Sequence, residues 1–271
     1  MSIKASEDGL IIPEVGQWAK RKYHFLHRYL DIFATGMKNK WRRRIYVDLF
    51  AGAGFARLRN SGELATTSAL LAADVRDPFS ELLLCEQDSE RFGALRHRLT
   101  HHFPEQEFLA RNADANRVVS EFMPRLLVEE TLSLVFVDPY GLHFDFDTAR
   151  QLSGARVDLI VLFADSMDAL RNWATYYLNN PHSSLDRFMG ESGWRNVVRD
   201  NPSSDLGRKL RERYSQRLQT LGFRHFGSEP VHNDQGTRLY TLMFASKHKT
   251  GLDFWHKASS VDERGQRSFS F

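Results

Sequence analysis

The stretch YVDLFAGAG, residues Tyr46–Gly54, decides the fold together with a second stretch, LVFVDPYG, residues Leu134–Gly141. Each is an apolar, β-branched run that stops at an acid and then turns, the first on glycines and the second on Asp-Pro-Tyr. Such runs are typical of parallel strands that are covered on both faces. In an open α/β sheet, ligands bind at the carboxyl ends of strands. The two strand ends therefore predict a nucleotide-like cofactor at the first and chemistry at the second.

Strand and helix patterns alternate outward from these two stretches, which predicts βαβ units and a largely parallel sheet. The expected strands are 44–50, 81–86, 106–111, 132–137 and 157–163, followed by a hairpin of 223–231 and 238–245 that turns at 233–236. The expected helices are 15–37, 64–75, 88–102, 115–128, 145–154, 204–221 and 251–259. Residues 55–62 are expected to form an inserted loop.

The chain of 271 residues is long enough for one large domain with an appendage. We expect an N-terminal helical extension over 1–40 and an α/β domain over 41–260. Within that domain, 165–221 is expected to be a helical insertion that covers the substrate, and 261–271 a polar tail.

Composition narrows the class of protein. The single cysteine, Cys85, excludes an internal disulfide and a cysteine-rich metal site, and it falls in a strand-like run. No apolar stretch approaches the length of a membrane span, and the N-terminus lacks a secretory signal, so a cytoplasmic protein is expected. The net charge is only +3, but nine Lys and Arg residues stand against one acid in 18–44, and five against one in 207–217. These clusters either bind phosphates or form solvated helix faces.

The first candidate motif is the acid-and-glycine loop after the first strand, with Asp48, Phe50, Gly52 and Gly54. Glycine lets the backbone approach a ligand without a Cβ in the way. The loop does not lead directly into a helix, which disfavours a dinucleotide fingerprint. A tight turn after a buried strand is the alternative.

Two further acids follow the next two strands. Glu86 can accept hydrogen bonds from both ribose hydroxyls of an adenosine, and Asp88 is the better candidate to cap the helix that follows. Asp114 either accepts a hydrogen bond from an adenine amine or caps its own helix, and the sequence does not separate these two roles.

The fourth motif, Asp138-Pro139-Tyr140, is the candidate catalytic site. The Asp138 carboxylate and the Pro139 carbonyl are two acceptors, which suit the two N–H groups of an exocyclic amine, and Tyr140 offers a flat face for stacking a base. An ordinary strand-to-helix turn with Asp138 as its cap is the alternative. Nearby His143 and Asp145 have no second histidine close in sequence, so no metal is expected.

In order, these four elements resemble those of a class I S-adenosylmethionine-dependent methyltransferase. The resemblance implies a Rossmann-like fold, with a seven-stranded, mostly parallel sheet, an antiparallel C-terminal hairpin, an extra N-terminal helix and a helical insertion after the fifth strand. It implies that S-adenosyl-L-methionine is held by the glycine loop, Glu86 and Asp114. The segment 138–140 resembles the Asp-Pro-Pro-Tyr motif of methyltransferases that act on amines of nucleic acid bases, and also the Asp-Pro-Phe-Gly motif of some tRNA guanine methyltransferases.

A closer resemblance is to the three-Cys-motif partner (TcmP) family. It runs from about 18 to 258, and the matching segments are 22–30, 46–54, 136–141, 157–160, 240–248 and 251–255. Ala53 replaces a proline that is common in the glycine loop of this family. The resemblance implies a partner protein that carries a cysteine motif.

The favoured hypothesis is a methyltransferase that acts on an amine nitrogen of a nucleic acid base. The first alternative is a catalytically silent accessory protein of a nucleic-acid-related or defence system, which grips nucleic acid or a partner through the basic helices 15–37 and 204–221. The second is a methyltransferase of small-molecule amines, with residues 165–200 closing over the substrate.

Overall fold

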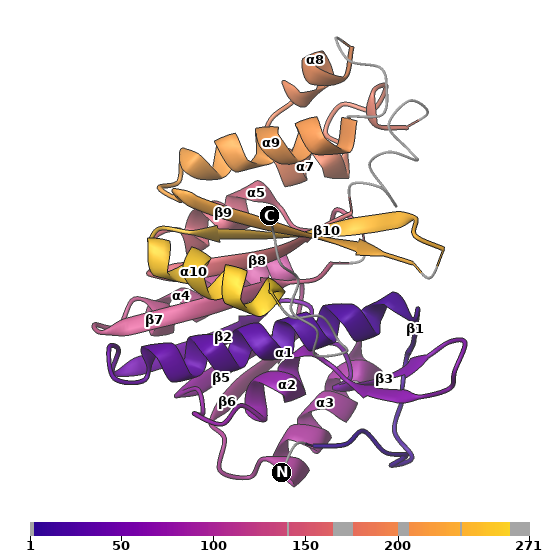
Figure 1. Ribbon diagram of the computed structural model, residues 1–271, viewed down its shortest axis with the longest axis vertical. Coiled ribbons are helices and arrows are strands. Elements are labelled where there is room, and N and C mark those ends of the chain that lie inside the picture. Colours follow the sequence, from indigo (N-terminus) through magenta and orange to yellow (C-terminus); the bar gives the residue numbers. More distant parts are fainter. Residues whose placement is uncertain (1–2, 140, 165–175, 200–205, 234, 261–271) are drawn as a thin grey trace.

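The computed structural model describes residues 3–139, 141–164, 176–199, 206–233 and 235–260. A seven-stranded sheet runs through its centre in the order β6-β5-β2-β7-β8-β10-β9 (Figure 1). The strands are β2 (Arg43–Asp48), β5 (Glu81–Glu86), β6 (Phe108–Asn112), β7 (Thr131–Val137), β8 (Val157–Phe163), β9 (His225–His232) and β10 (Arg238–Ser246). The first five are parallel, and β10 is antiparallel to both β8 and β9. This confirms the predicted α/β fold, a seven-stranded, mostly parallel sheet with an antiparallel C-terminal hairpin.

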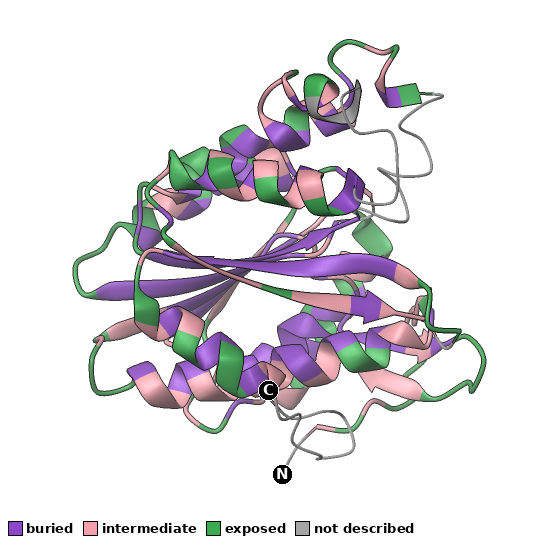
Figure 2. Ribbon diagram, turned by 45° about the horizontal axis from the view of Figure 1, so that its top comes forward, coloured by how far each residue is buried: buried purple, intermediate pink, exposed green. Residues whose placement is uncertain are grey.

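The middle of the sheet is its most apolar part. Every residue of β7 and β8 is buried, because helices cover both faces of the sheet there (Figure 2). In register, Val47 of β2 lies beside Val135 of β7, and Phe136 of β7 lies beside Ile160 of β8. The three strands therefore end at the same edge of the sheet, where ligands bind in folds of this kind.

Helices α1 (Trp18–Met37), α2 (Ser68–Ala73) and α10 (Lys249–Ser259) pack together on one face of the sheet (Figure 1). The other face carries α5 (Phe146–Leu152), α7 (Ser184–Met189) and α9 (Leu206–Gln219), whose Tyr214 packs on Phe146 and Phe163 (Figure 2). The remaining helices are α3 (Ser89–His102) and α4 (Ala115–Leu126), which both pack on β5, and α8 (Trp194–Arg199), which packs on α9.

The N-terminal helix is part of the main core. Its apolar face packs against α10, where the Trp255 ring lies 4.6 Å from that of Phe25 and 5.1 Å from that of Phe244. Gly227 of β9 allows this packing, since a Cβ there would lie 2.5 Å from the indole of Trp255. Residues 18–37 therefore pack into the same core as the sheet, and the division into an extension over 1–40 and a domain over 41–260 stays a prediction.

A second, three-stranded sheet was not predicted. It has the order β1-β3-β4, with β1 (Glu14–Val15), β3 (Phe55–Leu58) and β4 (Leu64–Thr66). The predicted loop 55–62 is thus a strand and a turn, and the predicted helix 64–75 begins only at Ser68. Leu64–Thr66 pair with Phe55–Arg57 of β3, and this pairing takes these three residues out of the helix.

The predicted insertion is described only in part. Residues 165–175 lie outside the described residues, as do 200–205 and the tail 261–271. The predicted basic helix 204–221 is α9, described from Leu206. In the described part of the chain, no helix combines the length and the apolar character needed to cross a membrane.

Candidate active site

The carboxyl ends of the parallel strands open into a cavity of about 1360 Å³. Its walls come from the segments that follow four neighbouring strands and from the start of α1. They include Leu49–Ala53 after β2, Glu86–Asp88 after β5, Ala113–Arg117 after β6, Asp138 and Pro139 after β7, and Trp18, Ala19, Lys22 and Tyr23 of α1. The structure therefore brings four of the predicted motifs to one cavity.

Glu86 is held in place by two backbone groups. The N–H of Gly52 donates to its Oε2 at 2.8 Å, and the N–H of Asp88 donates to its Oε1 at 2.9 Å. Gly52 has a φ of +66°, which a residue with a side chain rarely adopts. Each carboxylate oxygen keeps a further lone pair for a hydroxyl donor. Asp88 caps α3 by accepting from the N–H of Arg91, as predicted.

Two predicted cofactor residues, Asp48 and Gly54, do not line the cavity. Asp48 is fully buried behind the loop, where it accepts hydrogen bonds from the Tyr46 hydroxyl at 3.1 Å and from the Phe50 N–H at 3.2 Å. This burial raises the pKa of Asp48 to about 7. At Gly54, whose φ is +89°, a Cβ would lie 2.9 Å from a methyl group of Leu70. Both residues shape the loop from behind, whereas Phe50 and Gly52 face the cavity.

A buried arginine that the sequence analysis missed supports the same loop. Arg98 of α3 has no exposed surface, and it donates to the carbonyl of Ala53 at 2.7 Å and to that of Ile11 at 3.1 Å. It also donates to both carboxylate oxygens of Asp8, and its guanidinium lies 4.6 Å from the centre of the Phe55 ring. Asp8 and Ile11 of the N-terminal segment are thus linked through Arg98 to the loop after β2, which stabilises the loop.

Asp114 caps α4, because its Oδ1 accepts from the N–H of Asn116 at 2.9 Å and from that of Arg117 at 3.2 Å. The capping interpretation is therefore confirmed. Asp114 also lines the cavity, so its contact with an adenine amine stays a prediction.

Asp138 forms an ion pair with Lys22 of α1, and both side chains are nearly buried. Burial alone lowers the pKa of a lysine, but the adjacent Asp138 charge and hydrogen bond raise the pKa of Lys22 well above its ordinary value. Lys22 is therefore charged at neutral pH. Pro139 lines the cavity beside this pair, and Tyr140 lies outside the described residues.

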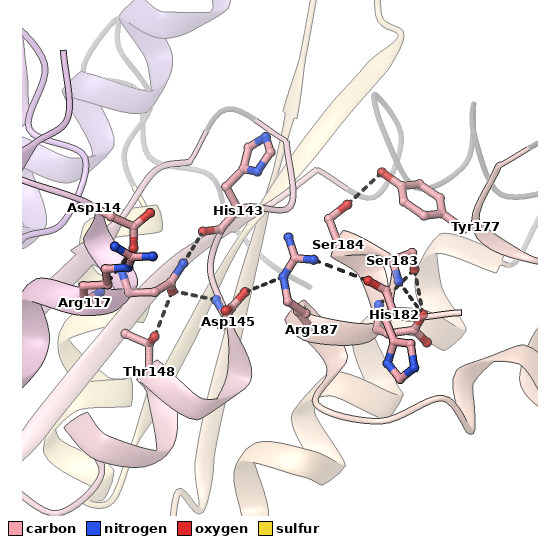
Figure 3. A network of polar contacts seen from close by, with 12 residues as sticks. Asp114, Arg117, His143, Asp145, Thr148, Tyr177, His182, Ser183, Ser184 and Arg187 are labelled. Atoms are coloured by element: carbon pink, nitrogen blue, oxygen red, sulfur yellow. Dashed lines mark hydrogen bonds and ion pairs between the residues drawn. The ribbon is translucent and has the colours of Figure 1, made fainter. Parts of the chain in front are cut away.

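A polar network links the cavity wall to α5 and α7 (Figure 3). Asn116 accepts hydrogen bonds from the N–H of Asp145 at 2.9 Å and from the Thr148 hydroxyl at 2.8 Å. Its amide donates to the carbonyl of His143 at 3.0 Å, and Asp145 pairs with Arg187 of α7 at 3.2 Å. The network joins α4, α5 and α7. In the residues that the structure describes, no group of three or more His, Cys, Asp or Glu side chains is arranged to hold a metal.

The two predicted basic helices are largely neutralised by nearby acids. Among the described residues, the ion pairs of α1 and its C-terminal cap include Lys20–Glu63, Arg21–Glu229, Lys22–Asp138 and Lys38–Asp77, and those of α9 include Arg208–Glu212 and Arg213–Glu191. Other arginines line the cavity itself, namely Arg59, Arg91, Arg117 and Arg187. Two of these also have acidic partners, since Arg59 pairs with Glu14 at 3.8 Å and Arg187 with Asp145 at 3.2 Å, and nucleic acid binding through the two helices stays a prediction.

The sequence matches no family model and no curated protein. Among solved structures, the fold is similar to that of protein LPL1258 from Legionella pneumophila, with 11% identity over 92% of this chain and 95% of that one and a TM-score of 0.55. Trm1 from Pyrococcus horikoshii, solved with S-adenosyl-L-methionine, gives 11% identity, 93% and 64% coverage and a TM-score of 0.47. An O-methyltransferase from Bacillus cereus, solved with SAH, has 10% identity over 83% of this chain and 80% of that one, with a TM-score of 0.44.

Proposed function

We propose that the protein is an S-adenosyl-L-methionine-dependent methyltransferase that acts on an amine nitrogen of a nucleic acid base. The observation that carries the proposal is the meeting of Gly52, Glu86, Asp114 and Asp138, from the ends of four adjacent strands, at one cavity. Its volume of about 1360 Å³ exceeds the roughly 300–1,000 Å³ of a typical ligand pocket, so a cofactor and part of an acceptor can share it.

The residues present fit the cofactor. Glu86 is a carboxylate fixed by two backbone N–H groups, and its remaining lone pairs suit a pair of ribose hydroxyls. At Gly52 a Cβ would meet nothing within 4 Å, so the loop faces open space there. Asp114 and Ala115 also line the cavity, and they are the residues that we propose to contact the adenine. When bound, the cofactor supplies an activated methyl group, which leaves the protein mainly with binding and orientation.

The acceptor end contains Asp138 and Pro139. A carboxylate and a carbonyl oxygen can hold the two protons of an exocyclic amine, which directs the nitrogen lone pair away from them. We infer that the acceptor is part of a nucleic acid because four arginines, Arg59, Arg91, Arg117 and Arg187, line the same cavity, and arginine is well suited to phosphate. Arg59 and Arg187 also pair with Glu14 and Asp145, so a phosphate would compete with these two acids.

One observation favours the catalytically silent alternative. Lys22 already occupies one oxygen of Asp138, so an acceptor amine meets a carboxylate that is partly engaged. Under that alternative the cavity still binds S-adenosyl-L-methionine, but no methyl group is transferred. Membership of the TcmP family, and with it a partner protein that carries a cysteine motif, remains a proposal that rests on the sequence resemblance.

Calorimetric titration with S-adenosyl-L-methionine and S-adenosylhomocysteine tests the cofactor site. We expect micromolar binding that falls at least tenfold in Glu86→Gln, because the change removes the charge that strengthens hydrogen bonds from the hydroxyls. Glu90→Gln, on the first turn of α3 and away from the cavity, should bind as the wild type does. If neither ligand binds the wild type, the proposed function is wrong.

Transfer of a labelled methyl group to single-stranded DNA and RNA tests the reaction. Asp138→Asn should lose transfer while it keeps cofactor affinity, and Asp147→Asn, an exposed acid paired with Arg150, serves as its matched control. Cofactor binding without transfer to either polymer or to nucleosides would favour the silent alternative.

A further inference from the structure

Lys22 has more hydrogen-bond donors than the described residues of the protein use. An ammonium group has three N–H donors. Within the described part of the chain, Asp138 is the only hydrogen-bond acceptor for which a contact with Lys22 is found, and the ammonium also lies 4.6 Å from the centre of the Tyr23 ring. The Lys22 side chain is only 10% exposed and lines the cavity. A buried charged donor without an acceptor is costly, so a ligand that brings an acceptor to this point gains binding free energy.

A second unused polar group lies in the same wall. Tyr240 of β10 is 3% exposed and lines the cavity, and its hydroxyl has no hydrogen-bond partner among the described residues. Lys22 and Asp138 both lie close enough to Tyr240 to influence its ionisation. The acceptor end of the cavity therefore presents an ammonium and a hydroxyl beside the Asp138 carboxylate.

Lys22 and Tyr240 are hydrogen-bond donors, and Asp138 beside them is an acceptor. A base that matches this arrangement has an amine, which donates to Asp138, next to an unprotonated ring nitrogen, which accepts from Lys22. Adenine presents that edge, since its N6 amine lies between N1 and N7, and cytosine presents it with N4 and N3. In guanine the N2 amine lies beside N1–H, which is itself a donor, and the other neighbour, N3, is crowded by the sugar. Uracil has no exocyclic amine.

We propose that Lys22 is a specificity-determining residue that donates a hydrogen bond to a ring nitrogen of adenine or cytosine while Asp138 receives the adjacent amine. The inference rests on the proposed function and narrows it, because it excludes guanine as the acceptor. Bringing the N1–H of guanine against a buried ammonium leaves two donors facing each other, which is a strong means of discrimination. Tyr240 is placed to support the same ring nitrogen.

The test uses oligonucleotides in which one ring nitrogen is replaced by C–H. Single-turnover transfer is measured on adenine, 1-deazaadenine and 7-deazaadenine, and on cytosine and 3-deazacytosine, with the wild type and Lys22→Met. The wild type should transfer about 10- to 100-fold more slowly to the analogue that lacks the contacted nitrogen, the usual effect of removing a hydrogen bond to a charged group. Lys22→Met should transfer to parent and analogue at rates within about threefold of each other. The comparison cancels any intrinsic effect of the analogue on amine reactivity.

Lys22→Arg keeps a charged donor and should retain part of the discrimination. Tyr240→Phe is a second test variant, because it leaves the Lys22–Asp138 pair intact. It should reduce, without abolishing, the difference in transfer rate between each parent base and its deaza analogue. Lys38→Met, which breaks a surface ion pair with Asp77, should leave the discrimination as in the wild type. Transfer to guanine, or equal discrimination by the wild type and Lys22→Met, would overturn the inference and leave the proposed function standing. Failure to transfer to any base, with the cofactor bound, would overturn both.

Discussion

Arg98 and Asp8 lie 90 residues apart in the chain and meet through two hydrogen bonds, of 2.7 and 2.8 Å, behind the loop after β2. The same guanidinium donates to the carbonyl of Ala53 within that loop. Since Arg98 is fully buried, its charge depends on Asp8 for compensation, and the loop depends on both.

The first prediction concerns this pair. Asp8→Asn should lower the free energy of unfolding by about 3 kcal/mol, because it leaves a buried charge without its partner. The adjacent residue gives a matched control, since Glu7 pairs with Arg57 at the surface. Glu7→Gln should cost less than about 1 kcal/mol. Urea unfolding of the two variants measures both values, and equal losses would show that Arg98 does not depend on Asp8.

The second prediction concerns the two glycines Gly52 and Gly62, which have φ values of +66° and +69° and open space, free of other atoms to 4 Å, where a Cβ would stand. Alanine at either position should cost about 1–2 kcal/mol of stability through backbone strain. Of the two, Gly52 lines the cavity and Gly62 does not. In titration calorimetry, Gly52→Ala should therefore weaken S-adenosyl-L-methionine binding, whereas Gly62→Ala should not. Equal affinity of the two variants for S-adenosyl-L-methionine would show that Gly52 does not contact the cofactor.

The third prediction concerns pH. Burial raises the pKa of Asp48 and that of Asp158 to about 7, from about 4 in an unfolded chain. The folded state then binds more protons than the unfolded state between these values, so stability should fall as pH rises from about 4 to about 7 and level off above it. Asp158→Asn should flatten part of this slope, since an amide does not ionise. The check is the free energy of unfolding measured at several pH values from about 4 to about 8, and a slope unchanged in Asp158→Asn would exclude this origin.

The fourth prediction concerns packing. Gly227→Ala should destabilise the protein by about 1–3 kcal/mol, because the added Cβ overlaps the Trp255 indole that joins α10 to the sheet. Gly93→Ala is the matched control, since Gly93 lies exposed within α3 with nothing near its Cβ position. That change should stabilise the helix by about 0.5–1 kcal/mol. Thermal unfolding distinguishes the opposite signs, and a neutral Gly227→Ala would mean that α10 can shift without cost.

The strands were predictable from local sequence because burial on both faces leaves a continuous apolar run, as in β7 and β8. β3 and β4 escaped prediction because they are short and their pairing partners include the distant β1. The helix start at Ser68 could not be read from residues 64–75, since helical propensity there does not reveal that Leu64–Thr66 pair with β3.

Residues that act across long distances in the chain were the ones missed at the site. In the sequence, Arg98 is one of several cations in a polar helix, and only the structure shows that it contacts Asp8 and Ala53. Lys22 gave one usable signal, because it lies four residues before Leu26 and so falls on the apolar face of α1. Asp48 was predicted to bind the cofactor, but sequence alone could not tell that it is fully buried and does not line the cavity.

The described segments between β8 and β9 contribute little to the wall of the cavity. The described residues 176–199 and 206–219 lie between β8 and β9 in the chain, and Arg187 is the residue of these segments that lines the cavity. The loops that face the proposed cofactor end instead follow β2, β5 and β6. Because these sets of residues come from separate stretches and Arg187 reaches the cavity wall through its ion pair with Asp145, we expect that replacing the segments between β8 and β9 would change the proposed acceptor end of the cavity more than the proposed cofactor end.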